Sequence, residues 1–205
     1  MERTLERTTE RTIGPRVAFQ GAYGAYSELA IARQWPEGAT SVPCSTFPDA
    51  LKAVVTGDAD FAVIPVENAI VGPVRVALDA LASIGDDVVV RSELRVPIHL
   101  CLLAPAGASL AELREVRSHA VALAQCRIFF ARHPWLISMP HEDTAGAARD
   151  VAAARNRTWG AVAGETAAER YGLEIIARNI EDVPANWTRF LVVSRAATAT
   201  DTNRR

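Results

Sequence analysis

The chain has 205 residues, of which 49% are hydrophobic and 22% charged, and its formal net charge is −2. This composition excludes a disordered chain, and the charges are spread along it without the basic stripe that nucleic acid binding needs. No apolar run approaches the roughly 20 residues of a membrane-spanning helix and the charged start lacks a signal-peptide core, so we expect a cytoplasmic protein with neither a membrane nor a nucleic acid partner.

Three cysteines, Cys44, Cys101 and Cys126, lie far apart and form no Cys-x-x-Cys pair. An odd number of scattered thiols predicts neither a disulfide framework nor a zinc site. We expect reduced thiols that pack in the interior.

The first 14 residues repeat Glu-Arg-Thr without an apolar face, so we expect residues 1–14 to be a mobile tail. After this tail, strands and helices alternate. The expected elements are a strand at 16–20, a glycine turn at 21–27, a helix at 28–35 halted by Pro36, a capped helix ending near Gly57, a strand at 61–66 and a helix at 72–85.

The stretch 87–105 is long enough for two extended segments linked through 92–94, and we expect the chain to cross there to a second lobe. That lobe continues the alternation and ends with a strand that returns to the first lobe. Its expected elements are a strand-to-helix junction at 118–119, a helix at 144–156, a strand at 159–164 and a helix at 165–172.

The predicted organisation is a first lobe at 15–90 plus 182–196, a second lobe at 91–181 and a polar tail at 197–205. Alternation of this kind predicts an α/β protein with parallel sheets covered by helices. Two lobes joined in this way leave a cleft between them, which is a common place for a small ligand.

The segment GAYGAYSE at 21–28 follows the first strand and begins a helix. Backbone N–H groups at such a junction can bind an anion such as a carboxylate, so Tyr26 and Ser27 are candidate ligand contacts. The alternative is a plain glycine turn in which Ser27 caps the helix. The spacing matches neither a dinucleotide fingerprint nor a phosphate loop.

Glu67 and Asn68 end a buried strand, where open parallel sheets present their ligand contacts. The pair could hold a polar ligand. Alternatively, Asn68 closes a turn while Glu67 faces solvent.

Ser118 and His119 lie at a strand-to-helix junction. His119 resembles a general base, but no Ser/His/Asp order accompanies it, and a cap or a packed residue is the simpler interpretation.

A second polar group precedes the helix at 144–156, where Asp143 or Thr144 provides the cap. His141 and Glu142 before it lack metal-ligand spacing. Since the chain has one lysine, Lys52, and no nucleotide loop, we expect catalysis by positioning and hydrogen bonding, without a metal or a cofactor.

Four segments in order, at 21–30, 61–72, 118–126 and 171–193, resemble the catalytic domain of prephenate dehydratases. The most specific is Asn186 followed by Thr188, Arg189 and Phe190, which is similar to the Asn-x-Thr-Arg-Phe signature of that family. The resemblance covers residues 16–195 or so.

The resemblance implies two α/β lobes like those of type II periplasmic binding proteins, with the active site in the interlobe cleft of a homodimer or larger homo-oligomer. It implies that prephenate loses carbon dioxide and its ring hydroxyl to give phenylpyruvate, a step of phenylalanine biosynthesis that needs no metal or cofactor. Thr188 is then the proton donor to the leaving hydroxyl. The implied substrate contacts are Tyr26, Ser27, Glu67, Asn68, Ser118, His119, Thr144, Asn186, Arg189 and Phe190. The regulatory ACT domain that commonly follows is not expected within this chain.

The chain departs from the family at two motifs. Ala69 and Val71 replace a serine and a glutamate of Glu-Asn-Ser-x-Glu-Gly, and Ala120 and Val121 replace the last two residues of Ser-His-Pro-Gln. Because lost polar groups change which ligand a buried site accepts, two alternatives stay open. One is a non-aromatising prephenate decarboxylase of specialised metabolism, and the other is a two-lobed binding module without turnover. Such decarboxylases typically lack the threonine, so the presence of Thr188 favours dehydration.

Neighbouring residues of one strand point to opposite faces, so Thr188 and Arg189 cannot both reach a ligand from a strand. Either the strand begins near Phe190 and both residues lie in a loop, or Thr188 alone meets the substrate and Arg189 supports the motif from behind. We expect Thr188 to face the ligand. The choice among prephenate, arogenate and an amino-substituted analogue is not decided by the sequence.

Overall fold

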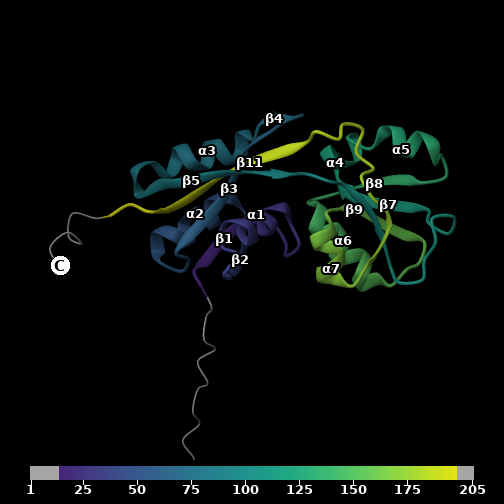
Figure 1. Cartoon of the computed structure of the whole chain (residues 1–205), viewed down its shortest axis with the longest axis horizontal. Coiled ribbons are helices and arrows are strands. Elements are labelled where there is room, and N and C mark those ends of the chain that lie inside the picture. Colours follow the sequence, from purple (N-terminus) through teal and green to yellow (C-terminus); the bar gives the residue numbers. More distant parts are fainter. Residues whose placement is uncertain (1–13, 198–205) are drawn as a thin grey trace, which may run out of the picture.

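The computed structural model describes residues 14–197 and arranges them as two α/β lobes that lie side by side along the long axis (Figure 1). The expected tails at 1–14 and 197–205 lie outside the described residues except for Gly14 and Ala197. Two extended crossings join the lobes, one after β5 and one before β11 (Figure 1).

The first lobe is built on a sheet in the order β2-β1-β3-β11-β5, with β4 paired to β3. Its elements are β1 (Arg16–Gln20), α1 (Tyr26–Gln34), β2 (Thr40–Cys44), α2 (Phe47–Thr56), β3 (Phe61–Asn68), β4 (Gly72–Pro73), α3 (Arg75–Ile84), the 3-10 turn η1 (Gly85–Asp87), β5 (Val88–Pro97) and the returning β11 (Trp187–Arg195). The strand β2 was not expected, because Pro43 interrupts its apolar pattern.

The second lobe has its own sheet, in the order β10-β6-β9-β7-β8. Its elements are β6 (Cys101–Ala104), β7 (Glu115–His119), α4 (Ala120–Ala124), α5 (Arg127–Arg132), β8 (Ile137–His141), α6 (Thr144–Ala154), β9 (Trp159–Ala163), α7 (Glu165–Tyr171) and β10 (Glu174–Ala177). The strand-to-helix junction at 118–119 is confirmed.

Both sheets are mixed, which corrects the prediction of parallel sheets. β11 runs antiparallel to β3 and β5, and β6 runs antiparallel to β9 and β10. The reason is that the two crossings run in opposite directions between the lobes. β3 and β5 both run toward the cleft. β11 enters the first sheet from the cleft and therefore runs antiparallel to both.

The position of the first crossing also differs from the prediction. The segment 92–94 lies within β5, which pairs with β11 along its whole length, so the predicted lobe boundary at residue 91 falls inside a strand of the first sheet. The chain crosses at residues 98–100, between Pro97 at the end of β5 and Cys101 at the start of β6. Pairing to β11 thus decides where β5 ends.

Alternation along the strands gives each sheet two buried faces. In the first lobe, Ala18, Ala62 and Ile64 pack against α2 and α3, whereas Val17 and Val63 pack on the α1 side. The second sheet is likewise covered on both faces. Double coverage explains why the strands read as continuous apolar runs.

Local signals set the ends of α2. The hydroxyl of Thr46 accepts a hydrogen bond from the Asp49 amide, and Gly57 ends the helix with a φ of 81°. A side-chain cap satisfies an amide at the start, and a left-handed glycine is a common end. The predicted end near Gly57 is confirmed.

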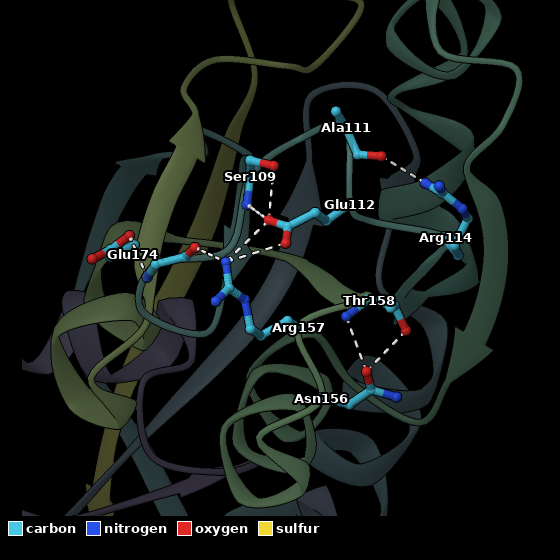
Figure 2. Close-up of polar contacts among 9 residues, drawn as sticks. Ser109, Ala111, Glu112, Arg114, Asn156, Arg157, Thr158 and Glu174 are labelled. Atoms are coloured by element: carbon cyan, nitrogen blue, oxygen red, sulfur yellow. Dashed lines mark hydrogen bonds and ion pairs between the residues drawn. The ribbon is translucent and has the colours of Figure 1, made fainter.

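Polar contacts connect the loop that follows β6 to the loop that precedes β9 (Figure 2). Glu112 accepts hydrogen bonds from the amide and hydroxyl of Ser109, both at 2.8 Å, and pairs with Arg157 at 3.2 Å. The Ser109 bonds, followed by Arg157, lower the pKa of Glu112. These exposed contacts shape a loop remote from the cleft.

The three cysteines are free thiols, with Cys101 and Cys126 buried and Cys44 partly buried. Burial raises the pKa of Cys126 to about 12, which keeps this thiol protonated and unreactive at neutral pH. Among residues 14–197, no helix has both the length and the apolar character to cross a membrane.

Candidate active site

The cleft between the lobes contains a cavity of about 450 Å³, within the range of small-ligand sites. Both crossings and both lobes contribute to its wall. The first lobe contributes Gln20 and Gly21 at the end of β1, Tyr26 and Ser27 at the start of α1, Asn68 at the end of β3, and Asn186, Thr188 and Phe190 around the start of β11. The second lobe contributes His119, Val121 and Gln125 at α4, and Asp143 and Thr144 at the start of α6.

Thr188 lies on the cavity side of β11 and is 9% exposed. The side-chain nitrogen of Asn68 lies 3.0 Å from the Thr188 hydroxyl oxygen, 3.0 Å from the Trp187 carbonyl oxygen and 2.9 Å from the Asn186 side-chain oxygen, so its two hydrogens are shared among three acceptors. The side-chain oxygen of Asn68 accepts from the amides of Ile70 and Val71 at 3.0 and 3.1 Å, which fixes the orientation of the amide. Because the amide nitrogen can only donate, the Thr188 oxygen is the acceptor, and its own hydrogen is available to a ligand.

Asn186 extends this network from the first lobe to the second. Its side-chain oxygen accepts from Asn68 at 2.9 Å, and its side-chain nitrogen donates to Gln125 at 3.1 Å. Its backbone oxygen accepts from the Ile98 amide at 3.0 Å. Asn186 is 3% exposed, so these bonds take the place of the hydrogen bonds that its polar atoms would make with water.

Arg189 points away from the cavity, on the opposite face of β11. It pairs with Glu67 on β3 at 3.0 Å and with Glu93 on β5 at 3.1 Å, and these bonds, that to Glu93 first, raise its pKa. Both neighbours belong to strands that flank β11. Of the two arrangements left open by the sequence, the structure has the strand begin at Trp187, with Thr188 toward the cavity and Arg189 behind it.

Eight of the eleven residues expected at the site line the cavity, namely Tyr26, Ser27, Asn68, His119, Thr144, Asn186, Thr188 and Phe190. The other three do not. Glu67 and Arg189 pair on the far face of the sheet, and the buried Ser118 hydroxyl donates to the Val162 carbonyl within the second sheet. Strand alternation accounts for Glu67, which precedes Asn68 and therefore points the other way.

The capping predictions have mixed outcomes. Ser27 does not cap α1, because the N-cap is Ala25 and makes no side-chain bond, and Ser27 sits inside the first turn instead. His119 does cap α4, accepting from the Val121 amide at 3.3 Å, so its other ring nitrogen carries the hydrogen. Asp143 caps α6 by accepting from Gly146 at 2.6 Å, which leaves the Thr144 side chain at the cavity.

The starts of α1 and α6 both face the cavity, through Ser27 and Thr144. The free amides and positive dipole end of a helix favour a carboxylate. Among the described residues that line the cavity, none is a lysine or arginine. An anionic ligand therefore has to be held here by helix ends and neutral donors.

The turn at 21–26 packs directly on the second lobe. A Cβ on Gly24, where φ is +85°, would lie 2.8 Å from the Ala167 Cα, so only glycine permits this approach. Tyr26 donates its hydroxyl to the His99 carbonyl at 2.6 Å, and burial, the largest cause, raises its pKa well above the usual value. These contacts hold the start of α1 against the crossing and fix the width of the cleft.

Several cavity residues were not among the predicted contacts. Gln20 is the last residue of β1 and Gln125 follows α4, so each had a detectable signal in its place after an element. Ile98 and Leu100 had none, because they become part of the wall only through the first crossing. Among residues 14–197, no group of three or more acidic, histidine or cysteine side chains is placed to hold a metal ion.

Comparison with known proteins agrees with this architecture. The prephenate dehydratase family model matches residues 17–198. The chain is 40% identical over 189 residues to arogenate dehydratase/prephenate dehydratase 2 of Arabidopsis thaliana, covering 92% of this chain and 49% of that protein. It is 41% identical over 184 residues to a bifunctional N-acyl-homoserine lactone acylase/prephenate dehydratase of Komagataeibacter europaeus, covering 87% of this chain and 62% of that protein.

The crystal structure of prephenate dehydratase from Arthrobacter aurescens in complex with L-Phe aligns with a TM-score of 0.81 and 31% identity, over 89% of this chain and 61% of that one. This agreement confirms the expected two-lobed α/β fold. The chain spans about half the length of several curated relatives, with shares of 49% and 42% for two of them. From the family model and these relatives together, the chain belongs to the prephenate dehydratase family.

Proposed function

We propose that the protein catalyses the decarboxylating dehydration of a prephenate-type substrate, prephenate or its amino-acid counterpart arogenate, with Thr188 as the proton donor. The observation that carries the proposal is the Thr188 hydroxyl, which accepts from Asn68 inside the cavity and so keeps its own hydrogen for a ligand. The family membership and the names of the relatives support the reaction class.

In the proposed reaction, Thr188 donates its hydrogen to the ring hydroxyl as the C–O bond breaks and water leaves. The ring carboxylate departs as carbon dioxide, and its bonding electrons complete the aromatic ring. A threonine is a weak acid, so it acts as a positioned relay whose proton is restored from solvent. The Asn68 donor stabilises negative charge that develops on the Thr188 oxygen.

The wall of the cavity fits the rest of the reaction. Phe190, Ile98 and Leu100 surround an apolar space. A charged carboxylate loses its hydration there, and because it leaves as neutral carbon dioxide, this loss favours decarboxylation. The start of α1 at Ser27 provides a place for the ring carboxylate of the substrate, whereas the start of α6 is already capped by the Asp143 carboxylate. Aromatisation supplies the driving force, so the protein has mainly to orient the substrate.

Incubation of the purified protein with prephenate and, separately, arogenate tests the proposal. Ultraviolet absorbance and mass spectrometry are expected to show an aromatic product lacking carbon dioxide and water. A decarboxylated but non-aromatic product would instead identify the decarboxylase alternative. Stabilisation of the fold by either compound without turnover would support the binding module. The expected homo-oligomer and cytoplasmic location stay predictions.

A further inference from the structure

A second hollow of about 530 Å³ adjoins the cavity of Thr188 in the interlobe cleft. Four residues line both spaces: Gln20, Gly21, Glu142 and Asp143. The two spaces differ in chemistry, since the first is largely apolar and has no cationic residue among its described wall, whereas Arg149 and Arg170 line the second. A ligand whose ring lies near Thr188 can therefore extend a polar group past Glu142 into the second hollow.

Glu142 is the acidic residue of this region without another role in the structure. Its neighbours are engaged, because His141 bonds Asp150 at 3.0 Å and Asp143 caps α6 through Gly146. Glu142 itself is exposed, and within residues 14–197 its carboxylate has neither a hydrogen bond nor an ion pair. Its charge is thus available to a ligand at the border of the two spaces.

Arg170 provides a positive charge in the same hollow. Its guanidinium lies 4.3 Å from the centroid of the Tyr23 ring, and Tyr23 is held in place because its carbonyl accepts from the Tyr171 hydroxyl at 2.6 Å. Arg170 has no ion pair with a described residue, whereas Arg149 bonds Asp150 at 2.9 Å. A stacked guanidinium is oriented while its N–H edge stays free for a carboxylate.

The polar end of the cleft therefore offers one uncommitted carboxylate and one uncommitted guanidinium. We propose that Glu142 determines the choice of substrate side chain, accepting the α-ammonium of an amino-acid side chain while Arg170 pairs with its carboxylate. The inference rests on the proposed dehydratase function and adds that arogenate is preferred to prephenate. An α-keto group has no donor for Glu142, so a pyruvyl side chain keeps the pairing of its carboxylate with Arg170 but gains nothing from Glu142, whose charge repels that carboxylate.

The test compares kcat/KM for arogenate and prephenate in the wild-type protein and in Glu142→Gln. We expect the wild type to prefer arogenate. Glu142→Gln should lower kcat/KM for arogenate about tenfold, because a charge-assisted hydrogen bond is lost, while the value for prephenate stays equal or rises. Glu169→Gln is the matched control: an exposed acid on α7 of the same lobe that lines a different hollow. It should leave the substrate ratio unchanged.

Arg170→Gln supplies a second measurement, since both substrates carry the side-chain carboxylate. It should raise KM for both by a similar factor and leave their ratio near the wild-type value. Two results would overturn the inference and leave the dehydratase function standing. One is a wild type that prefers prephenate. The other is a Glu142→Gln variant that keeps the wild-type substrate ratio while its melting temperature shows that it is folded. Failure to dehydrate either compound would instead reject the proposed function.

Discussion

Thr188 and Arg189 are adjacent in sequence but occupy two environments on opposite faces of β11. On the cavity face, Thr188 belongs to a network of neutral amides, with Asn68, Asn186 and Gln125 bonded at 2.9 to 3.1 Å. On the other face, Arg189 joins Glu67 and Glu93 in a partly exposed charge cluster. The neutral side can present a hydroxyl to an anionic substrate without a fixed charge of its own, whereas the charged side connects three strands. The period of two along a strand thus separates the chemistry of the motif from its structural support.

The largest effect is expected from Thr188→Ala, which removes the proposed donor. Turnover should fall about 10²-fold or more, whereas the loss of stability should be modest, because the Asn186 side chain and the Trp187 carbonyl remain as acceptors for the Asn68 nitrogen. Thr188→Ser keeps the hydroxyl and should retain most activity. Steady-state kinetics with both substrates measure the change, and wild-type rates in the alanine variant would show that this face has no chemical role.

Asn186→Ala tests whether the neutral network needs its central member. The change leaves Asn68 and Gln125 without one partner each in a buried region, which should lower the free energy of unfolding by about 1–3 kcal/mol. Activity should fall as well, because the orientation of Asn68 toward Thr188 loosens. Urea denaturation gives the stability. An unchanged midpoint would mean that water replaces the lost bonds.

A smaller effect is expected on the charged face. Arg189→Gln removes two partly exposed ion pairs, which should cost less than about 1 kcal/mol of stability after screening by solvent. Activity should stay within a few-fold of wild type, and added salt should reduce the stability difference between the two proteins. A loss of turnover as large as that of Thr188→Ala would contradict the separation of the two faces.

The smallest effect should come from the exposed pair of Arg16 and Asp60, which lies at the end of β3 opposite to Asn68 and shows what an ordinary surface ion pair contributes. The hydrogen bonds from Arg16 lower the pKa of Asp60, so this pair stabilises the fold above the unfolded pKa of the carboxyl group. The contribution is lost as pH falls through the lowered folded pKa, that is, below about pH 4. Melting temperatures of wild type and Asp60→Asn should therefore differ slightly near neutral pH and converge in acid. A difference that grows in acid would have the wrong sign.

The elements that sequence reasoning predicted correctly are those with local signals. Thr46 and Gly57 mark both ends of α2, and the apolar run at 61–66 marks β3. The missed features depend on partners distant in sequence. β2 became a strand by pairing with β1 despite Pro43, and β5 continues to Pro97 because β11 lies beside it.

The candidate site shows the same division. The motif around Thr188, with Asn68, Ser27 and Thr144, could be predicted because each residue stands where a strand ends or a helix begins. The sequence left open whether Glu67 meets the ligand or faces away, because it does not show which of two alternating faces meets the cleft; the pairing with Arg189 on the far face favours the second interpretation. Ile98 and Leu100 could not be predicted, since a crossing segment has no pattern that marks it as part of a wall.

By itself the sequence determined the alternation of strands and helices, the two lobes and the motif that carries the candidate chemistry, because these depend on local propensity and on residue order. Only the tertiary structure decided that β11 enters the first sheet antiparallel between β3 and β5. That pairing turns Thr188 toward the cavity and Arg189 toward Glu67 and Glu93. Packing of α6 against α7 within the second lobe brings Glu142 and Arg170, from separate elements, to one polar hollow. The physical reason is that pairing and packing between distant segments set which face of each element meets the cleft.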